Sequence, residues 1–86
     1  MSITEKNTAI QELMDMQQRL ESLEADYAKA NDEGRKMIDK NYDQILSTRR
    51  GMEIMLKALG VDFDRRNVLY RDINGETRLH TIWYLV

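Results

Sequence analysis

The side chains with the most distinctive chemistry form a basic group in the last third of the chain. Its members are Arg65, Arg66, Arg71, Arg78 and His80. A guanidinium group presents a planar fork of N–H donors that fits a phosphate or a carboxylate. One hypothesis is therefore a small anion- or nucleotide-binding site built from these residues. The alternative is that nearby acids, such as Asp72 and Glu76, neutralise them.

Residues for catalysis or metal binding are sparse. The chain has one His and no Cys, so it lacks thiolate ligands and a second imidazole for a metal site. Nucleophilic catalysis needs a hydroxyl or thiol held beside a base. The single His80 falls in a predicted strand, whereas the serines fall in predicted helices. No Gly-rich phosphate loop occurs, and we expect no enzyme activity, metal or cofactor.

Length and charge limit the classes of protein that fit. The 86 residues suit a single domain covering 1–86. Residues 1–48 carry ten acids and six bases, and residues 49–86 carry five acids and seven bases. A general nucleic-acid binder needs a more basic face, so we expect no nucleic-acid partner. No apolar run suits a membrane span and no secretory signal is evident, so we expect no membrane association and a cytoplasmic location.

Two apolar seams must form the scaffold for these side chains. The first consists of Leu13, Met16, Leu20, Leu23, Tyr27 and Ala30. The second consists of Ile38, Tyr42, Ile45, Arg49, Met52, Leu56 and Leu59. Both follow the alternating steps of three and four residues of a coiled-coil seam. Arg49 interrupts the second seam, either as a stem that lies on apolar neighbours or as a partner-specifying ion pair.

The break between the seams favours two helices over one. Residues 31–34, Asn-Asp-Glu-Gly, combine a capping residue, acids typical of a first helical turn and a helix breaker. They predict a helical hairpin with helices at 3–31 and 35–59. A single long helix stays open, since one interior Gly costs only about 1 kcal/mol. Ser2 and Glu5 have capping-box spacing, and Gly60 followed by Val61 is typical of a helix C-terminus.

Residues 67–86 predict an antiparallel β-hairpin around Asn74-Gly75. A two-residue type I′ turn would place Arg71 opposite Arg78 and Leu69 opposite His80. A three-residue turn with a bulge would shift this register and separate the Arg residues. In the two-residue register, one face mixes Arg71, Arg78 and His80 with apolar residues. We expect that face to be covered by a strand from residues 61–64, by a second subunit or by a partner.

The succession of elements resembles small accessory proteins of bacterial phages and mobile elements. The resemblance rests on a helical first half, Met-Leu-Lys-Ala-Leu-Gly at 55–60 and a hairpin that ends in Tyr84-Leu85-Val86. It covers roughly residues 50–86 and contains no specific motif, so no functional residue is carried over. It implies a protein that binds a host protein. Some proteins of this kind inhibit host defence, as anti-CRISPR proteins do.

The sequence therefore predicts an α+β protein with an N-terminal helical hairpin and a C-terminal antiparallel β-hairpin. We expect non-catalytic protein binding that occludes a partner's surface, with contacts at Arg71, Arg78, Trp83 and Tyr84. We also expect a homo-oligomer that forms through the seams or the hairpin. The two other hypotheses are the anion or nucleotide site described above and a structural oligomer in a phage or mobile-element assembly.

Overall fold

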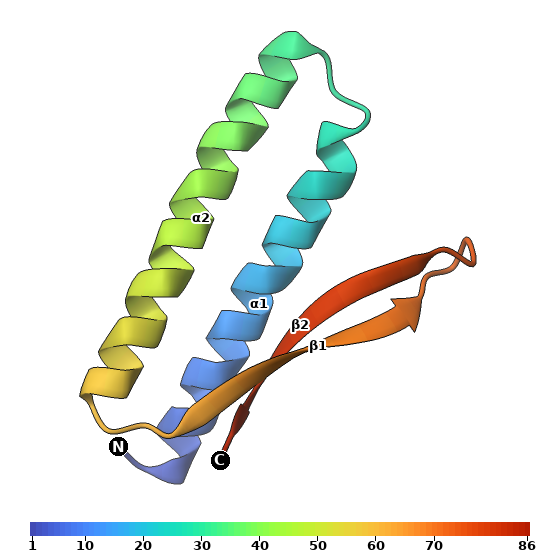
Figure 1. Ribbon diagram of the computed structural model, residues 1–86. Coiled ribbons are helices and arrows are strands. Elements are labelled where there is room, and N and C mark those ends of the chain that lie inside the picture. Colours follow the sequence, from blue (N-terminus) through green and yellow to red (C-terminus); the bar gives the residue numbers. More distant parts are fainter.

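The computed structural model describes residues 1–86 and contains two helices followed by two strands. These are α1 (Ile3–Tyr27), α2 (Asp32–Ala58), β1 (Phe63–Arg71) and β2 (Thr77–Leu85). The helices form an antiparallel hairpin, and the two-stranded antiparallel sheet crosses α1 (Figure 1). This architecture confirms the predicted α+β fold and the helical hairpin. Neither helix is long and apolar enough to cross a membrane.

Side-chain caps set where the two helices begin. The Glu5 backbone N–H donates to Ser2 Oγ at 3.1 Å, and the Ser2 N–H donates to Glu5 Oε1 at 3.3 Å, which completes the predicted capping box. The Asn31 side chain accepts from the Gly34 N–H at 2.9 Å. Because Asn31 caps the second helix, α1 ends at Tyr27 instead of residue 31 and α2 begins at Asp32 instead of residue 35.

The C-terminus of α2 has the predicted glycine geometry. Gly60 has a φ of 79°, a conformation that only Gly adopts without a Cβ penalty. The Gly60 N–H donates to the Lys57 carbonyl and the Val61 N–H donates to the Leu56 carbonyl, both at 3.0 Å. This pair of hydrogen bonds is a Schellman motif. Leu56 and Val61 are each 1% exposed, so the turn also buries these two apolar side chains in the core.

The two predicted seams face each other inside the helical hairpin. In α1, Leu13 and Leu20 are fully buried and Met16 and Leu23 are half-buried. In α2, all seam residues from Ile38 to Leu56 are half-buried or buried, and Leu59 is exposed. The seams are therefore used within one chain.

The main hydrophobic core lies at one end of the molecule, where α1, α2 and the strands converge. It consists of Ala9, Ile10, Leu13, Leu56, Val61, Phe63 and Trp83. Three partly buried side chains pack against it: Met14, Met52 and Leu85. We call this end of the molecule the base and the opposite end, where residues 28–31 join the helices, the loop end. Both chain termini lie at the base (Figure 1).

The predicted two-residue turn is wrong, and the strands pair one residue out of the expected register. Arg71 pairs with Thr77 and Tyr70 pairs with Arg78, so the two Arg residues are not opposed. Gly75 takes a φ of 79° but Asn74 does not take a positive φ, whereas a type I′ turn requires both. Asp72 stabilises a longer turn, because its carboxylate accepts the N–H groups of Asn74 and Glu76, each at 2.9 Å.

The first strand also begins earlier than predicted. Residues 61–64 were expected as a third strand that covers the hairpin face, but β1 starts at Phe63 and pairs it with Leu85. The Val86 N–H donates to the Asp62 carbonyl at 3.1 Å and extends the ladder beyond this pair. Because Phe63 is 5% exposed, this longer strand brings an aromatic side chain into the base.

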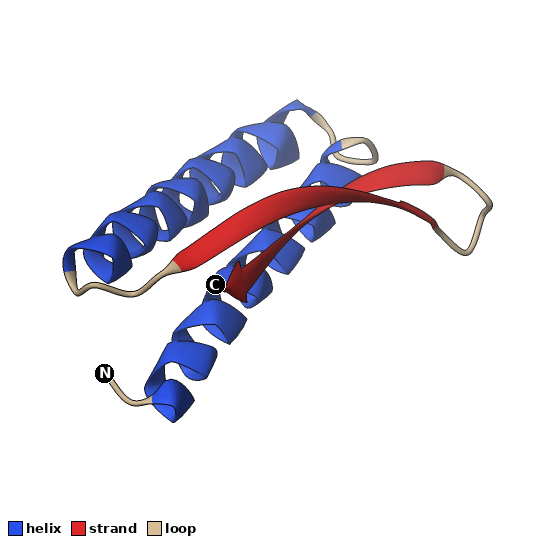
Figure 2. Cartoon of the chain, turned by 60° about the horizontal axis from the view of Figure 1, so that its bottom comes forward, coloured by secondary structure: helices blue, strands red, loops and turns tan.

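The hairpin twists strongly along its length (Figure 2), and its inward face changes as it does so. At the base, the odd-numbered Phe63 and Trp83 are buried while the even-numbered Tyr84 is exposed. Toward the tip, the even-numbered His80 contacts α1 while the odd-numbered Leu79 is exposed. Two-stranded ribbons show the largest twist among sheets, which explains the change.

Candidate binding surface on the hairpin

The predicted anion group does not converge as a whole: Arg78 and His80 line one cleft, and the other three members lie outside it. Arg65 Nη1 lies 3.4 Å from Glu53 Oε1. Arg78 Nε lies 2.6 Å from Asp72 Oδ2, and its Nη2 lies 3.7 Å from Glu76 Oε2. The hydrogen bond from Arg78 lowers the pKa of Asp72 and raises the pKa of Arg78. Two of the four Arg residues of the group, Arg65 and Arg78, therefore pair with carboxylates of the same chain, and Arg78 does so with Asp72 and Glu76, as the alternative interpretation expected.

The other three members of the group point in different directions. His80 Nδ1 lies 2.8 Å from Glu21 Oε1, on the side of the sheet that faces α1. The guanidinium carbon of Arg66, the fourth residue of β1, lies 5.9 Å from the centroid of the Tyr84 ring. Arg71 is exposed near the tip and has no carboxylate within ion-pair distance. Arg66 and Arg71 remain the two free guanidinium groups of the hairpin.

Trp83, expected as a partner contact, is buried in the base at 2% exposure. It lies on the face that packs against the helices, and the guanidinium carbon of Arg49 is 5.5 Å from its ring centroid. Its indole N–H has no hydrogen-bond partner. Trp83 therefore belongs to the core and has almost no surface to offer a partner. Tyr84, the other aromatic residue of that prediction, is 41% exposed.

Arg49 is the polar centre of the junction between the helices and the sheet. Its guanidinium donates to Gln17 Oε1 of α1, and its Nε lies 3.7 Å from Glu53 Oε1. Burial lowers the pKa of Arg49 despite the adjacent carboxylate. Arg49 therefore fits neither interpretation of the sequence in full. Its side chain is only 13% exposed, so the charged head does not project into solvent, and its ion pair joins it to Glu53 of the same helix and specifies no partner.

A cleft of about 670 Å³ between α1 and the hairpin tip was not anticipated from the sequence. Glu21 and His80 meet there, and the His80 ring makes an edge contact with Tyr70 at 5.9 Å between centroids. Glu21 and His80 are 59 residues apart, so no local spacing predicts their contact. A carboxylate on imidazole Nδ1 orients the ring, but no hydroxyl is hydrogen-bonded to this imidazole. The pair ties the hairpin to α1.

Metal-ligating side chains do not gather anywhere in the structure. No group of three or more His, Cys, Asp or Glu residues has the geometry to hold an ion. Glu21 and His80 form a pair with no third ligand, and a protein metal site normally requires at least three. The side chains that line the cleft therefore do not have the arrangement of a metal site.

The most unusual surface is the outward side of the hairpin near its tip. Leu69 and Leu79 lie directly opposite each other there and are 72% and 57% exposed. The neighbouring pairs are polar: Asn67 with Thr81, and Arg71 with Thr77. We call these six residues the hairpin outer face. The sequence did not single out the leucine pair, because the assumed register placed Leu69 opposite His80.

Both outer edges of this small sheet are unpaired along most of their length. The sheet has only two strands, so each strand presents one edge with free backbone N–H and C=O groups. Such edges can pair with an extended segment of another chain. The leucine pair therefore sits between two edges that are available for backbone hydrogen bonds.

Comparisons with protein-family models, with curated proteins and with solved structures found no match to this chain.

Proposed function

We propose that this chain is a non-catalytic protein-binding protein and that the hairpin outer face is its contact surface. The observation that carries the proposal is the directly opposed and exposed pair of Leu69 and Leu79. Solvent-facing positions of a small sheet normally carry polar side chains. An exposed apolar pair surrounded by polar residues has the composition typical of the centre of a protein–protein interface.

The chemistry of the face also indicates the partner. Arg71 adjoins the leucine pair and has no carboxylate of its own chain. The hairpin from Phe63 to Val86 carries four Arg and three acidic residues, against an acidic excess in the helices. A fitting partner is a protein segment with an apolar side chain for the leucines and an acidic residue for Arg71. An extended segment could also use a free strand edge.

The resemblance to phage accessory proteins suggests that the partner is a host protein. The proposed mechanism is that the bound chain occludes the surface of that protein. Occlusion requires only affinity and bulk, which agrees with a binding face that lacks a reactive group. The anion-binding hypothesis has less support, because the two free guanidinium groups, those of Arg66 and Arg71, are five residues apart in β1, or roughly 16 Å along an extended strand. A thermal-shift screen with nucleotides and inorganic phosphate should leave the melting temperature unchanged.

The test compares the full chain with a Leu69→Lys, Leu79→Lys double variant. Proteins captured by the wild-type chain are purified, and their direct affinity for both chains is measured by isothermal titration calorimetry. Loss of two central apolar contacts should weaken a specific complex by about thirtyfold or more. The helices and the base should be unaffected, because both leucines are exposed.

A matched control replaces residues of similar exposure elsewhere. An Ile54→Lys variant changes an exposed apolar residue of α2 and should keep the wild-type affinity. The proposal is overturned if no purified protein binds the wild-type chain directly, or if the double variant binds as tightly as wild type. A nucleotide that raises the melting temperature would replace it with the anion-binding function.

A further inference from the structure

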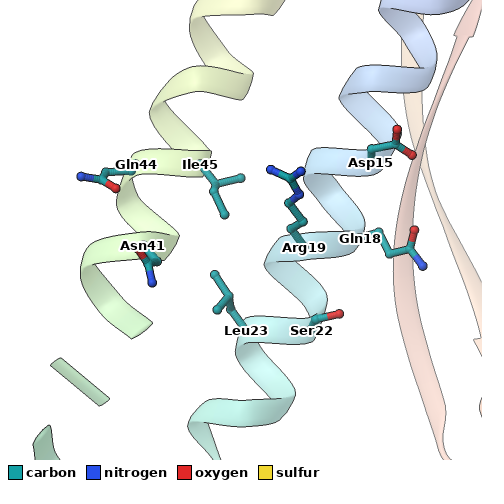
Figure 3. A pocket seen from close by; sticks show the side chains of 8 residues that line it. All are labelled: Asp15, Gln18, Arg19, Ser22, Leu23, Asn41, Gln44 and Ile45. Atoms are coloured by element: carbon teal, nitrogen blue, oxygen red, sulfur yellow. The ribbon is translucent and has the colours of Figure 1, made fainter. Parts of the chain in front are cut away.

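A second heptad line runs along α2, separate from the seam that faces α1. Its members follow steps of four and three residues and are all exposed: Met37, Asn41, Gln44, Thr48, Gly51, Met55 and Ala58. Residues at this spacing lie along one stripe of a helix. Glu53 and Lys57, which contact the hairpin, lie on another side of α2. Figure 3 shows two members of this line, Asn41 and Gln44, beside the open groove between α2 and α1, with the Gln44 side chain directed away from α1.

This exposed line contains no charged residue. Charged side chains make up 11 of the 27 residues of α2, and all of them lie off the line. The solvent face of a surface helix normally carries the charges. The line therefore lacks the charges of an ordinary solvent face: four of its members are apolar or Gly, and the other three are uncharged polar residues.

Gly51 at the middle of this line has no explanation within the single chain. A Gly in a helix interior destabilises the helix relative to Ala. A Cβ added at Gly51 would meet nothing within 4 Å, so the fold of one chain does not require its absence. A close approach by another helix would require it.

The chain also exposes more surface than a folded monomer of its mass. Its accessible surface is 6401 Å², whereas the mass scaling of monomeric proteins gives about 5,300 Å² for 10.2 kDa. The excess of about 1,100 Å² is comparable with the roughly 800 Å² that each partner buries in a standard interface. The radius of gyration of 14.9 Å likewise exceeds the roughly 12 Å of a compact chain of this length.

We propose that two copies of this chain associate by antiparallel pairing of α2 along the exposed heptad line. A two-fold axis beside Thr48 brings members of the line opposite one another. Met37 then faces Ala58 of the second copy, and Asn41 faces Met55. Gln44 faces Gly51, and Thr48 faces Thr48.

This arrangement matches large side chains with small ones. Met37 and Gln44 each meet a residue with little or no side chain, which lets the two helices approach closely. The interface is isologous, which means that both copies use the same surface. Association therefore stops at a dimer, because neither copy keeps an unpaired α2 line. The hairpin outer face lies outside the interface, so this dimer neither requires nor excludes the function proposed above.

The first test is the absolute mass of the full chain by light scattering after size exclusion. We expect twice 10.2 kDa over a wide range of concentrations. A Thr48→Lys variant should have the mass of one chain, because the axis places two like charges face to face. A Ser47→Lys variant, which changes the exposed neighbour off the line, should stay dimeric.

A mixing experiment separates lost pairing from lost folding. Thr48→Lys and Thr48→Glu should each be monomeric with a wild-type circular dichroism spectrum, and an equimolar mixture should recover the mass of a dimer. Because the chain has no Cys, single-cysteine variants add a geometric test. Thr48→Cys should form a disulfide-linked dimer on oxidation, and Ser47→Cys should form it far more slowly.

Three results would overturn the proposal. They are a wild-type chain that is monomeric at all concentrations, a Thr48→Lys variant that stays dimeric, and equal cross-linking rates at positions 47 and 48.

Discussion

The base and the loop end of this molecule are held together in different ways. At the base, seven buried residues from both helices, both strands and the turn between α2 and β1 form one core. At the loop end, only the two helices meet, and the seam residues Tyr27, Ile38 and Tyr42 stay partly open to solvent. The contrast shows that a helical hairpin alone does not enclose a core, since the third layer supplied by the sheet is needed to do so.

Polar contacts replace apolar burial at the loop end. The Tyr42 hydroxyl donates to Glu24 Oε1 at 3.0 Å, and the guanidinium of Arg35 lies over the Tyr27 ring at 5.0 Å. Burial and the Glu24 carboxylate together raise the pKa of Tyr42. Exposed polar contacts contribute less than buried apolar side chains. The loop end should therefore open first, which amide hydrogen exchange can detect.

The largest expected effect comes from truncating the base. Leu13→Ala removes a side chain that is 0% exposed and should lower the free energy of unfolding by about 2–5 kcal/mol. Ile38→Ala removes a half-buried seam residue at the loop end and should lower it by about 1 kcal/mol. Chemical denaturation of both variants measures the difference. Equal losses would mean that stability is spread evenly along the helical hairpin.

The turn that leads from α2 into the base should give the next largest effect. Gly60→Ala forces an L-residue into the left-handed conformation and should lower the free energy of unfolding by about 1–2 kcal/mol. No atom lies within 4 Å of the added Cβ, so the loss is conformational and not steric. Gly60→Asn, which tolerates a positive φ better, should lose less. An Asn variant as unstable as the Ala variant would contradict this explanation.

Removing the cap at the loop end should have a smaller effect. Asn31→Ala deletes the acceptor for the Gly34 N–H and should lower the free energy of unfolding by about 1 kcal/mol. Asn31→Asp keeps an acceptor and should be close to wild type. Thermal unfolding of the three proteins gives the comparison. If the Asp variant is as unstable as the Ala variant, the cap hydrogen bond is not what stabilises this helix start.

The smallest expected effect is local to the hairpin tip. The Arg78 hydrogen bond lowers the pKa of Asp72, so the carboxylate favours the folded state at pH values above the ordinary aspartate range. That contribution disappears as the pH falls through the lowered pKa of the folded chain. Arg78→Gln should move the pKa of Asp72 back up toward its ordinary value, as measured by NMR titration of the carboxyl carbon. An unchanged pKa would remove Arg78 as the cause.

Local signals in the sequence predicted most of the fold. The capping box at Ser2 and the glycine turn at Gly60 involve neighbours in the chain, so residue types and spacing were sufficient. The heptad seams predicted the inward faces of both helices for the same reason. The helix junction was displaced by a few residues, because Asn31 can end one helix or begin the next and only the geometry distinguishes these roles.

Features that depend on distant residues were missed or misassigned. The strand register depends on the Asp72 carboxylate, which accepts the N–H groups of Asn74 and Glu76 and so stabilises a longer turn. The contact between Glu21 and His80 joins separate elements and has no sequence signature. Trp83 was expected among the partner contacts, but its position in β2 buries it in the core.

The change of inward face along the hairpin has a consequence for the tolerance of this chain to substitution. In a flat two-stranded sheet, every second position of each strand would be sensitive along its full length. Here the sensitive positions should be odd near the base, as at Trp83, and even near the tip, as at His80. In a complete substitution scan of β2, sensitive and tolerant positions should alternate. The alternation should switch from odd-numbered to even-numbered sensitive positions near Thr81 and Ile82, so the two halves of one strand would be under opposite selection patterns.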